Sequence, residues 1–159
     1  IHIISRIREE IPDITLRTTL ITGFPGESKE QHEELMDFVD EMAFGRLGVF
    51  TYSAEDGTPA AQMPDQVEES VKEARRAELM ELQQEIAFDQ AEQMIGREVL
   101  VMIEGKVADE NAYVGRTYKD APNVDGLIFV NTDTELLSGD FAKVRVTGAC
   151  EYDLIGELM

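Results

Sequence analysis

The chain has 159 residues, which suits one ordinary domain or two small ones, and its formal net charge is −19. The acidic excess is spread along the chain: residues 1–93 carry 21 acidic and 8 basic residues, and residues 94–159 carry 12 and 6. Nucleic-acid binding normally rests on clustered Lys and Arg, so this balance disfavours a nucleic-acid partner. It fits a basic protein partner, or it serves solubility alone.

Cysteine usage sets a second limit. The single cysteine, Cys150, excludes a disulfide within the chain and a cysteine-based metal cluster of its own. One thiol fits a reducing cytoplasm. No apolar run approaches the roughly 20 residues that span a bilayer, and no signal peptide is visible. The opening IHIISRIREEIPD predicts a helix without an initiator methionine, so we expect a fragment of a longer protein.

The first half of the chain predicts an α/β unit. Residues 16–22 (LRTTLIT) and 47–52 (LGVFTY) are rich in β-branched and apolar residues and predict strands. Between them, Ser28 and Gln31 have capping-box spacing, and apolar residues then recur at helical intervals, so a helix is expected over 28–43 and should end at Gly45. This order predicts two parallel strands joined by a crossover helix.

A long helix and a β-rich segment follow the loop at 53–64. Asp65 and Glu68 form a second capping pair, and an apolar stripe beginning at Val67, Val71 and Ala74 predicts one helix over 65–95. From Gly96, five short β-rich runs separated by turn residues predict a small all-β barrel. The expected domains are therefore 1–64, the connecting helix 65–95, and 96–159.

The turn Gly23-Phe24-Pro25-Gly26-Glu27 is the candidate ligand site. Ligands of parallel α/β units collect beyond the carboxyl ends of strands, glycine lets backbone approach a ligand, and a helix amino terminus offers N–H groups to a carboxylate or phosphate. Arg17 and Thr19 share a face of the first strand, and Phe50 and Tyr52 share a face of the second, where they could flank a flat ring. The alternative is an ordinary turn with a structural ion pair.

Catalytic side chains are weakly indicated. The two histidines are His2 and His32, and His32 lies in a charged stretch where we expect it to be solvated. The paired glutamates are most simply solvated helix faces. Cys150 lies near a strand end, and nothing nearby predicts a lowered thiol pKa.

The motifs together resemble a known family. LRTTLITGFPGE, GVFTYSAEDGTPAAQMPDQV and the helix containing ARRAELMELQQE are similar to the second half of radical S-adenosylmethionine methylthiotransferases, and the β-rich tail resembles their TRAM domain. GRTYKDAPNVDG resembles the RimO branch, which modifies an aspartate of a small-subunit ribosomal protein. The resemblance covers essentially the whole chain.

The resemblance implies an α/β fold followed by an all-β fold: the C-terminal part of a radical S-adenosylmethionine partial (β/α) barrel, then a five-stranded antiparallel TRAM barrel of OB-like type. It implies that an iron–sulfur cluster cleaves S-adenosylmethionine reductively, and that a methylthio group is installed on the β-carbon of an aspartate. By position, the residues lining the S-adenosylmethionine site would be Arg17, Thr19, Gly23, Phe24, Pro25, Gly26, Phe50 and Tyr52.

One departure from the family pattern limits this interpretation. The CxxxCxxC motif and the cysteines of a second cluster are absent, so both sets would lie upstream of Ile1. We therefore expect this chain alone to bind no cluster and to be inactive. Its first strand would lose a barrel neighbour, and the open edge predicts self-association.

The acidic barrel favours a basic ribosomal protein over tRNA as partner. The loop around residues 116–126 is the candidate recognition surface, through Arg116, Tyr118, Asp120 and Asp125, although it could equally be a plain hairpin connection. Two alternatives stay open: the same portion of a tRNA adenosine methylthiotransferase, and an acidic binding module without catalysis. We expect a cytoplasmic location.

Overall fold

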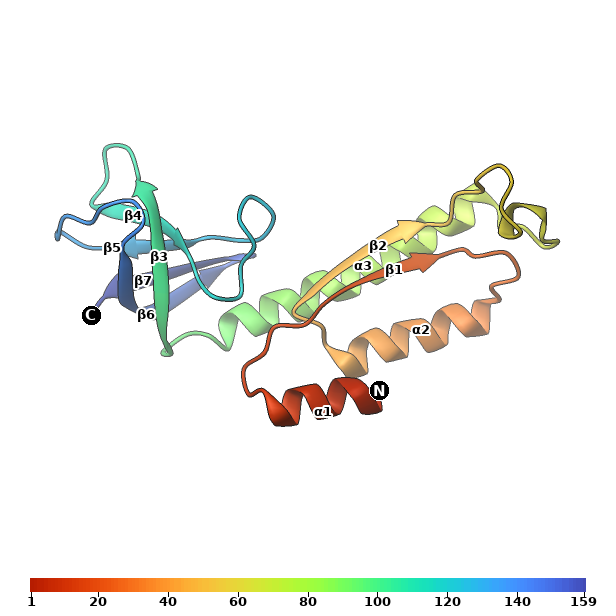
Figure 1. Cartoon of the computed structure of the whole chain (residues 1–159), viewed down its shortest axis with the longest axis horizontal. Helices are drawn as coiled ribbons and strands as arrows, with labels where there is room; N and C mark the ends of the chain where they lie inside the picture. Colours follow the sequence, from red (N-terminus) through yellow and green to blue (C-terminus); the bar gives the residue numbers. More distant parts are fainter. The chain divides into compact units, whose positions relative to one another are not determined.

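The computed structural model describes residues 1–159 and divides them into two compact units, 1–86 and 87–159. The boundary falls within a helix, α3 (Glu69–Glu92). Figure 1 shows the elements of both units in chain order. None of the helices is both long enough and apolar enough to traverse a lipid bilayer.

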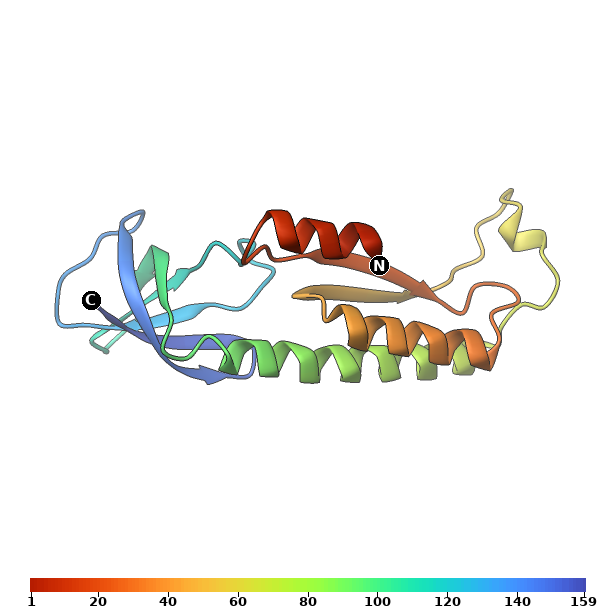
Figure 2. The same ribbon diagram turned by 90° about the horizontal axis from the view of Figure 1, so that it is seen from below.

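The first unit is built on two parallel strands. It comprises α1 (His2–Glu10), β1 (Arg17–Thr22), α2 (Lys29–Met42), β2 (Arg46–Thr51), a short 3₁₀ helix at Ala60–Gln62, and most of α3. Thr19 pairs with Gly48 and Ile21 with Phe50. Helices α2 and α3 lie along the same face of the strand pair (Figures 1 and 2). The parallel pairing and the crossover helix confirm the predicted strand–helix–strand unit.

The core of this unit is apolar and draws on each of these layers. Val39 of α2 and Leu79 of α3 are fully buried and pack with Val49 of β2. Helix α2 begins as predicted, because the Ser28 side chain accepts from the Gln31 N–H while the Gln31 side chain accepts from Ser28 N–H. The pKa of Glu30 is lowered, first by a hydrogen bond from its own backbone N–H and then by one from the Ser28 hydroxyl.

The carboxyl end of α2 differs from the prediction. Ala43, not Gly45, is the C-cap, with a left-handed backbone (φ 42°). Side chains from other helices satisfy the carbonyl groups there. Arg8 of α1 donates to the carbonyls of Met42 and Ala43, and Gln83 of α3 donates to the carbonyl of Phe44 at 2.9 Å. The missing glycine is thus compensated by side-chain donors at the helix end.

The start of α3 was also predicted wrongly. The helix begins at Glu69, and Asp65 has a left-handed backbone (φ 59°), so it does not cap the helix. Val71, expected in the apolar stripe, is 40% exposed. The buried face instead carries Lys72 and Gln83 beside Leu79. A long side chain can bury its methylene stem while its polar end finds partners, and apolar periodicity misses such positions.

The second unit is a closed five-stranded barrel, in which α3 is followed by β3 (Glu98–Lys106), β4 (Ala112–Arg116), β5 (Ile128–Asn131), β6 (Phe141–Cys150) and β7 (Asp153–Leu158). The strand order is β3-β4-β5-β7-β6. Its core includes the fully buried Val101, Ile103, Ile128, Val130 and Val144. The five-stranded barrel was predicted, but not its one parallel pair, β5 with β7.

Candidate functional site

The turn between β1 and α2 holds its shape through an internal anion, the carboxylate of Glu27. Its Oε2 accepts a hydrogen bond from the backbone N–H of Gly23 at 2.9 Å, and its Oε1 accepts from the Thr22 hydroxyl at 3.1 Å. Arg75 of α3 completes the cluster, with Nη1 2.7 Å from Oε1. The side chains of Glu27 and Arg75 are 12% and 11% exposed. A buried carboxylate with several charge-assisted bonds is well compensated for its desolvation.

Both glycines of the turn adopt conformations that other residues avoid. Gly23 and Gly26 have φ angles of 75° and 84°. A Cβ on Gly23 would also collide with the Cγ of Lys72, whereas one on Gly26 would meet nothing within 4 Å. Gly23 is therefore required by the packing of α3 against the turn as well as by its backbone. The close approach of the Lys72 stem therefore explains the glycine at position 23 without any need for a bound ligand.

Lys72 of α3 is a buried cation whose stem lies next to Gly23 of the turn. Its ammonium group donates to the backbone carbonyl of Tyr52 at 3.0 Å and to the carboxylate of Glu69 at 3.1 Å, and it lies 5.5 Å from the centre of the Tyr52 ring. Phe24 packs edge-on against the same ring, with 5.2 Å between centroids. The Tyr52 hydroxyl is buried without a hydrogen-bond partner. Phe24 of the turn and Lys72 of α3 thus both contact Tyr52, which follows the end of β2.

The other predicted site residues lie on the exposed face of the strand pair. Arg17, Thr19 and Ile21 alternate outward along β1, and Phe50 on β2 pairs with Ile21 and is 62% exposed. Tyr52 follows the strand end and is buried, whereas Phe50 is exposed.

The anion-binding expectation for this turn is not supported by its hydrogen bonds. The N–H of Gly23 goes to Glu27, that of Gly26 to the Asp65 carbonyl, and that of Ser28 to the Gln31 side chain. The N–H of Glu27 goes to the Phe24 carbonyl. Donors that a ligand carboxylate or phosphate would need are used internally. The side chain that the turn presents outward is Phe24, which is 43% exposed.

His32 was expected to be solvated, and this was wrong. It is 5% exposed, and its Nε2 lies 2.7 Å from the carboxylate of Glu78 on α3, while its Nδ1 has no hydrogen-bond partner. The sequence held the signal, because His32 stands three residues before Leu35 and seven before Val39, on the buried side of α2. The pair joins α2 to α3.

The four predicted recognition residues in the second unit divide into three structural ones and one exposed one. Asp120 accepts from the backbone N–H and hydroxyl of Thr117 at 3.0 and 2.6 Å, and Asp125 accepts from the N–H of Ala121 at 2.6 Å. Arg116 pairs with Glu104 on β3 at 3.0 Å. Tyr118 is 60% exposed. The two aspartates therefore shape the loop, as Asp commonly does in turns.

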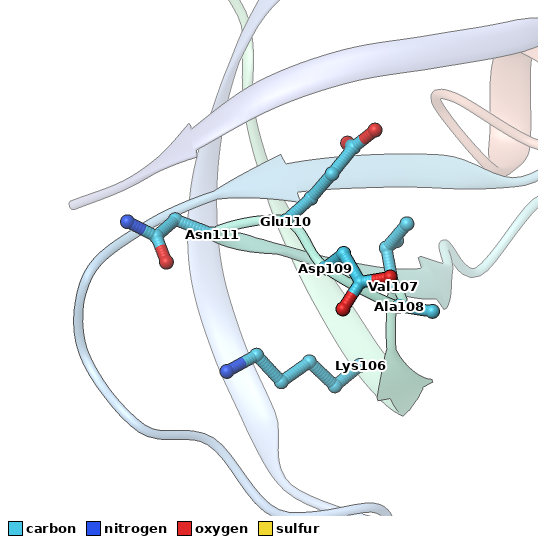
Figure 3. A pocket seen from close by; sticks show the side chains of 6 residues that line it. All are labelled: Lys106, Val107, Ala108, Asp109, Glu110 and Asn111. Carbon is cyan, nitrogen blue, oxygen red and sulfur yellow. The ribbon is translucent and has the colours of Figure 1, made fainter.

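A pocket of about 430 Å³ lies elsewhere on the barrel, at the end of the β3–β4 hairpin. It is lined by Lys106, Val107, Ala108, Asp109, Glu110 and Asn111. In Figure 3 the side chain of Glu110 points away from that of Lys106. None of the predicted site residues lines this pocket. No group of three or more His, Cys, Asp or Glu side chains could hold a metal ion within residues 1–159.

Comparison with known proteins extends these observations. A family described as the TRAM domain matches residues 95–159. The chain is 61% identical over 156 residues to the ribosomal protein uS12 methylthiotransferase RimO of Lachnoclostridium phytofermentans, which covers 98% of the chain and 36% of that protein. It is 47% identical over 157 residues to the protein of the same name from Desulfitobacterium hafniense, covering 99% of the chain and 35% of the relative.

The barrel and the family match together define the second unit as a TRAM domain. The chain as a whole is similar to methylthiotransferases of the RimO type, which confirms the resemblance predicted from its motifs. It spans about a third of the length of the curated relatives that it matches.

Proposed function

We propose that the chain is part of a radical S-adenosylmethionine methylthiotransferase that adds a methylthio group to the β-carbon of an aspartate in ribosomal protein uS12. The observation that carries the proposal is similarity along 98–99% of the chain to proteins named for that activity. In this proposal residues 1–64 belong to the radical domain, 65–95 connect, and 96–159 form the TRAM domain. The whole enzyme would act in the cytoplasm.

S-adenosylmethionine would lie against the exposed face of β1 and β2 and the turn that follows β1. Side chains that suit its parts are present there: exposed Phe24 and Phe50 for apolar or ring contacts, and Arg17 and Thr19 for polar ones. Gly23, Pro25, Gly26 and Tyr52 would support these contacts from the turn and from beneath it. When bound, the cofactor would supply the radical and methyl chemistry of the reaction.

The iron–sulfur clusters do not fit this chain. Each needs about three cysteine ligands or more, and residues 1–159 contain one cysteine, the exposed Cys150. We therefore derive no catalytic step from these residues and propose that the chain alone is inactive. Its role would be to bind and orient the cofactor and to bind the protein substrate.

Substrate recognition is proposed for the TRAM barrel. The acidic excess of residues 94–159 suits a lysine- and arginine-rich ribosomal protein, because complementary fields speed association. Of the loop residues predicted for contact, Tyr118 is 60% exposed, with the ammonium group of Lys119 5.9 Å from its ring centre, and we take this residue as the contact. Arg116, Asp120 and Asp125 would act by holding the loop in shape.

The test is binding of the chain to purified uS12, with tRNA as the comparison, at about 50 mM and about 300 mM salt. We expect binding to uS12 that weakens as salt rises, because screening reduces the attraction between opposite charges. We expect no binding to tRNA. A Tyr118→Ala variant should bind uS12 more weakly. The matched control is Tyr152→Ala, because the Tyr152 side chain is 48% exposed and lies outside that loop. Binding to tRNA alone would refute the choice of substrate.

A further inference from the structure

Arg75 of α3 fixes the backbone of the turn as well as a side chain on it. Its Nη1 lies 2.7 Å from the carboxylate of Glu27 and 3.0 Å from the backbone carbonyl of the same residue. Both side chains are nearly buried, which strengthens a charge-assisted bond relative to a surface ion pair. The position of the chain at Glu27 is therefore determined from α3.

Glu27 carries this constraint to the beginning of the turn. The same carboxylate holds the Thr22 hydroxyl and the Gly23 N–H, so the chain is tied to one group on both sides of Phe24 and Pro25. The N–H of Glu27 also donates to the carbonyl of Phe24 at 2.9 Å. Phe24 is thus carried on a closed hydrogen-bonded ring, and the direction of its exposed side chain depends on that ring.

The ion pair is not part of the apolar core of the unit. The buried cluster that joins α2, β2 and α3 is formed by Val39, Val49, Leu79 and Ile86, and neither Glu27 nor Arg75 is a member of it. Removal of the pair should leave that cluster in place. Its direct structural consequence is the conformation of residues 22–27.

We propose that Arg75 is a positioning residue, which acts through Glu27 to hold the Gly23–Gly26 turn and Phe24 in the conformation that binds S-adenosylmethionine. The inference rests on the proposed function, because it takes the turn to border the cofactor. Arg75 itself contacts neither cofactor nor substrate in this proposal.

The experiment compares Arg75→Gln and Glu27→Gln with Arg76→Gln. Arg76 is the adjacent arginine of the same helix, and its ion pair with Glu73 is exposed (46% and 52%). Hydrogen exchange at the Gly23 amide is measured in this chain by NMR. The KM for S-adenosylmethionine and kcat are measured in the full-length enzyme that contains the chain, with the dissociation constant measured separately. Circular dichroism checks that each variant is folded.

We expect Arg75→Gln and Glu27→Gln to speed exchange at Gly23 at least about tenfold and to raise the KM and dissociation constant about tenfold, with a much smaller change in kcat. A merely structural defect would lower the active fraction, and so kcat, without raising KM. Arg75→Lys keeps the charge but replaces the guanidinium, whose Nη1 makes both contacts, by an ammonium group on a differently shaped side chain, so it should give an intermediate KM. Arg76→Gln should match the unsubstituted protein.

Two results would overturn the positioning role. One is Arg75→Gln behaving like Arg76→Gln in both measurements. The other is faster exchange at Gly23 with an unchanged affinity for S-adenosylmethionine, which would leave the ion pair a local structural feature. Failure of the unsubstituted full-length enzyme to bind S-adenosylmethionine would instead refute the proposed function, and the positioning role with it.

Discussion

Lys72 explains at the scale of single residues why position 23 must be glycine. The stem of this buried lysine occupies the space that a Cβ at position 23 would need, and its ammonium group is held by the Tyr52 carbonyl and Glu69. Moving the lysine would disturb a buried cation and both of its hydrogen bonds, which is costly in a site excluded from water. Gly26 has a similar backbone conformation, but a Cβ there would meet no neighbour within 4 Å.

This difference predicts unequal effects of two matched substitutions. Gly26→Ala should lower the free energy of unfolding by about 1 kcal/mol, because alanine is strained at positive φ. Gly23→Ala should lower it by about 2–3 kcal/mol, because a steric clash is added to the same strain. Urea unfolding followed by circular dichroism measures both. Equal losses would show that the Lys72 stem moves aside at no cost.

At the scale of secondary-structure elements, Arg8 joins helix α1 to the carboxyl end of α2. No residue of α1 is buried, and the guanidinium of Arg8 donates to the carbonyls of Met42 and Ala43. A cation at a helix carboxyl terminus is favourable both as a donor and through the helix dipole. Of the other residues of α1, Ile4 and Ile7 are half-buried and the rest are exposed.

We therefore expect Arg8→Gln to release α1. Amide protection in residues 2–10 should fall to that of an isolated short helix, which is marginal in water, and unfolding stability should drop by about 1 kcal/mol. Arg6→Gln is the control, because Arg6 forms only an exposed pair with Glu10 within the helix (63% and 66%). Hydrogen exchange with mass spectrometry measures the protection. Similar protection in both variants would contradict a capping role for Arg8.

The sequence was sufficient to predict most elements, and its failures have physical causes. The capping box at Ser28 and the alternating strands of the barrel were found because they depend on local patterns. The cap at Ala43 was not, because Arg8 and Gln83 act on this helix end from distant positions. The start of α3 was not either, and the Asp65 carbonyl accepts from the distant N–H of Gly26. The parallel pairing of β5 with β7 likewise depends on chain topology, which short runs do not encode.

For the candidate turn, the sequence indicated the glycine-dependent backbone but not the hydrogen bonds that hold it. The turn at 23–27 was identified, and its conformation does depend on its glycines. Its donors, however, are satisfied by Glu27, whose partner Arg75 lies 48 residues away in sequence. The partner of His32 shows the same limit: the helical spacing of α2 accounts for the burial of His32, but Glu78 lies on another helix, 46 residues away in sequence. Long-range polar pairs of this kind leave no periodic trace in one sequence.

At the scale of the whole molecule, the first unit has open strand edges. Its sheet consists of β1 and β2 alone, and the exposed face carries Ile21 and Phe50 at 59% and 62% exposure. Unpaired edges and exposed apolar side chains both promote association between copies. The net charge of −19 opposes it by mutual repulsion. The balance between these two effects should depend on salt.

We expect the chain to self-associate reversibly, and more strongly as salt rises from about 50 mM to about 500 mM, because screening weakens the repulsion between acidic copies. Sedimentation velocity over a range of protein concentrations measures this. Ile21→Lys should reduce association by placing a charge on the exposed face, and Ile3→Lys, 73% exposed on α1, is the control. A strict monomer at high salt and high concentration would contradict the prediction.

Cys150 closes β6 and is the only thiol of the chain, and it is exposed. A maleimide dye or a spin label would therefore attach at one defined point on the barrel, without prior removal of competing cysteines. The unlabelled tyrosines would remain as an internal optical signal, since the chain has no tryptophan. Cys150 thus provides a single labelling site for fluorescence and magnetic-resonance tests of the proposed substrate binding.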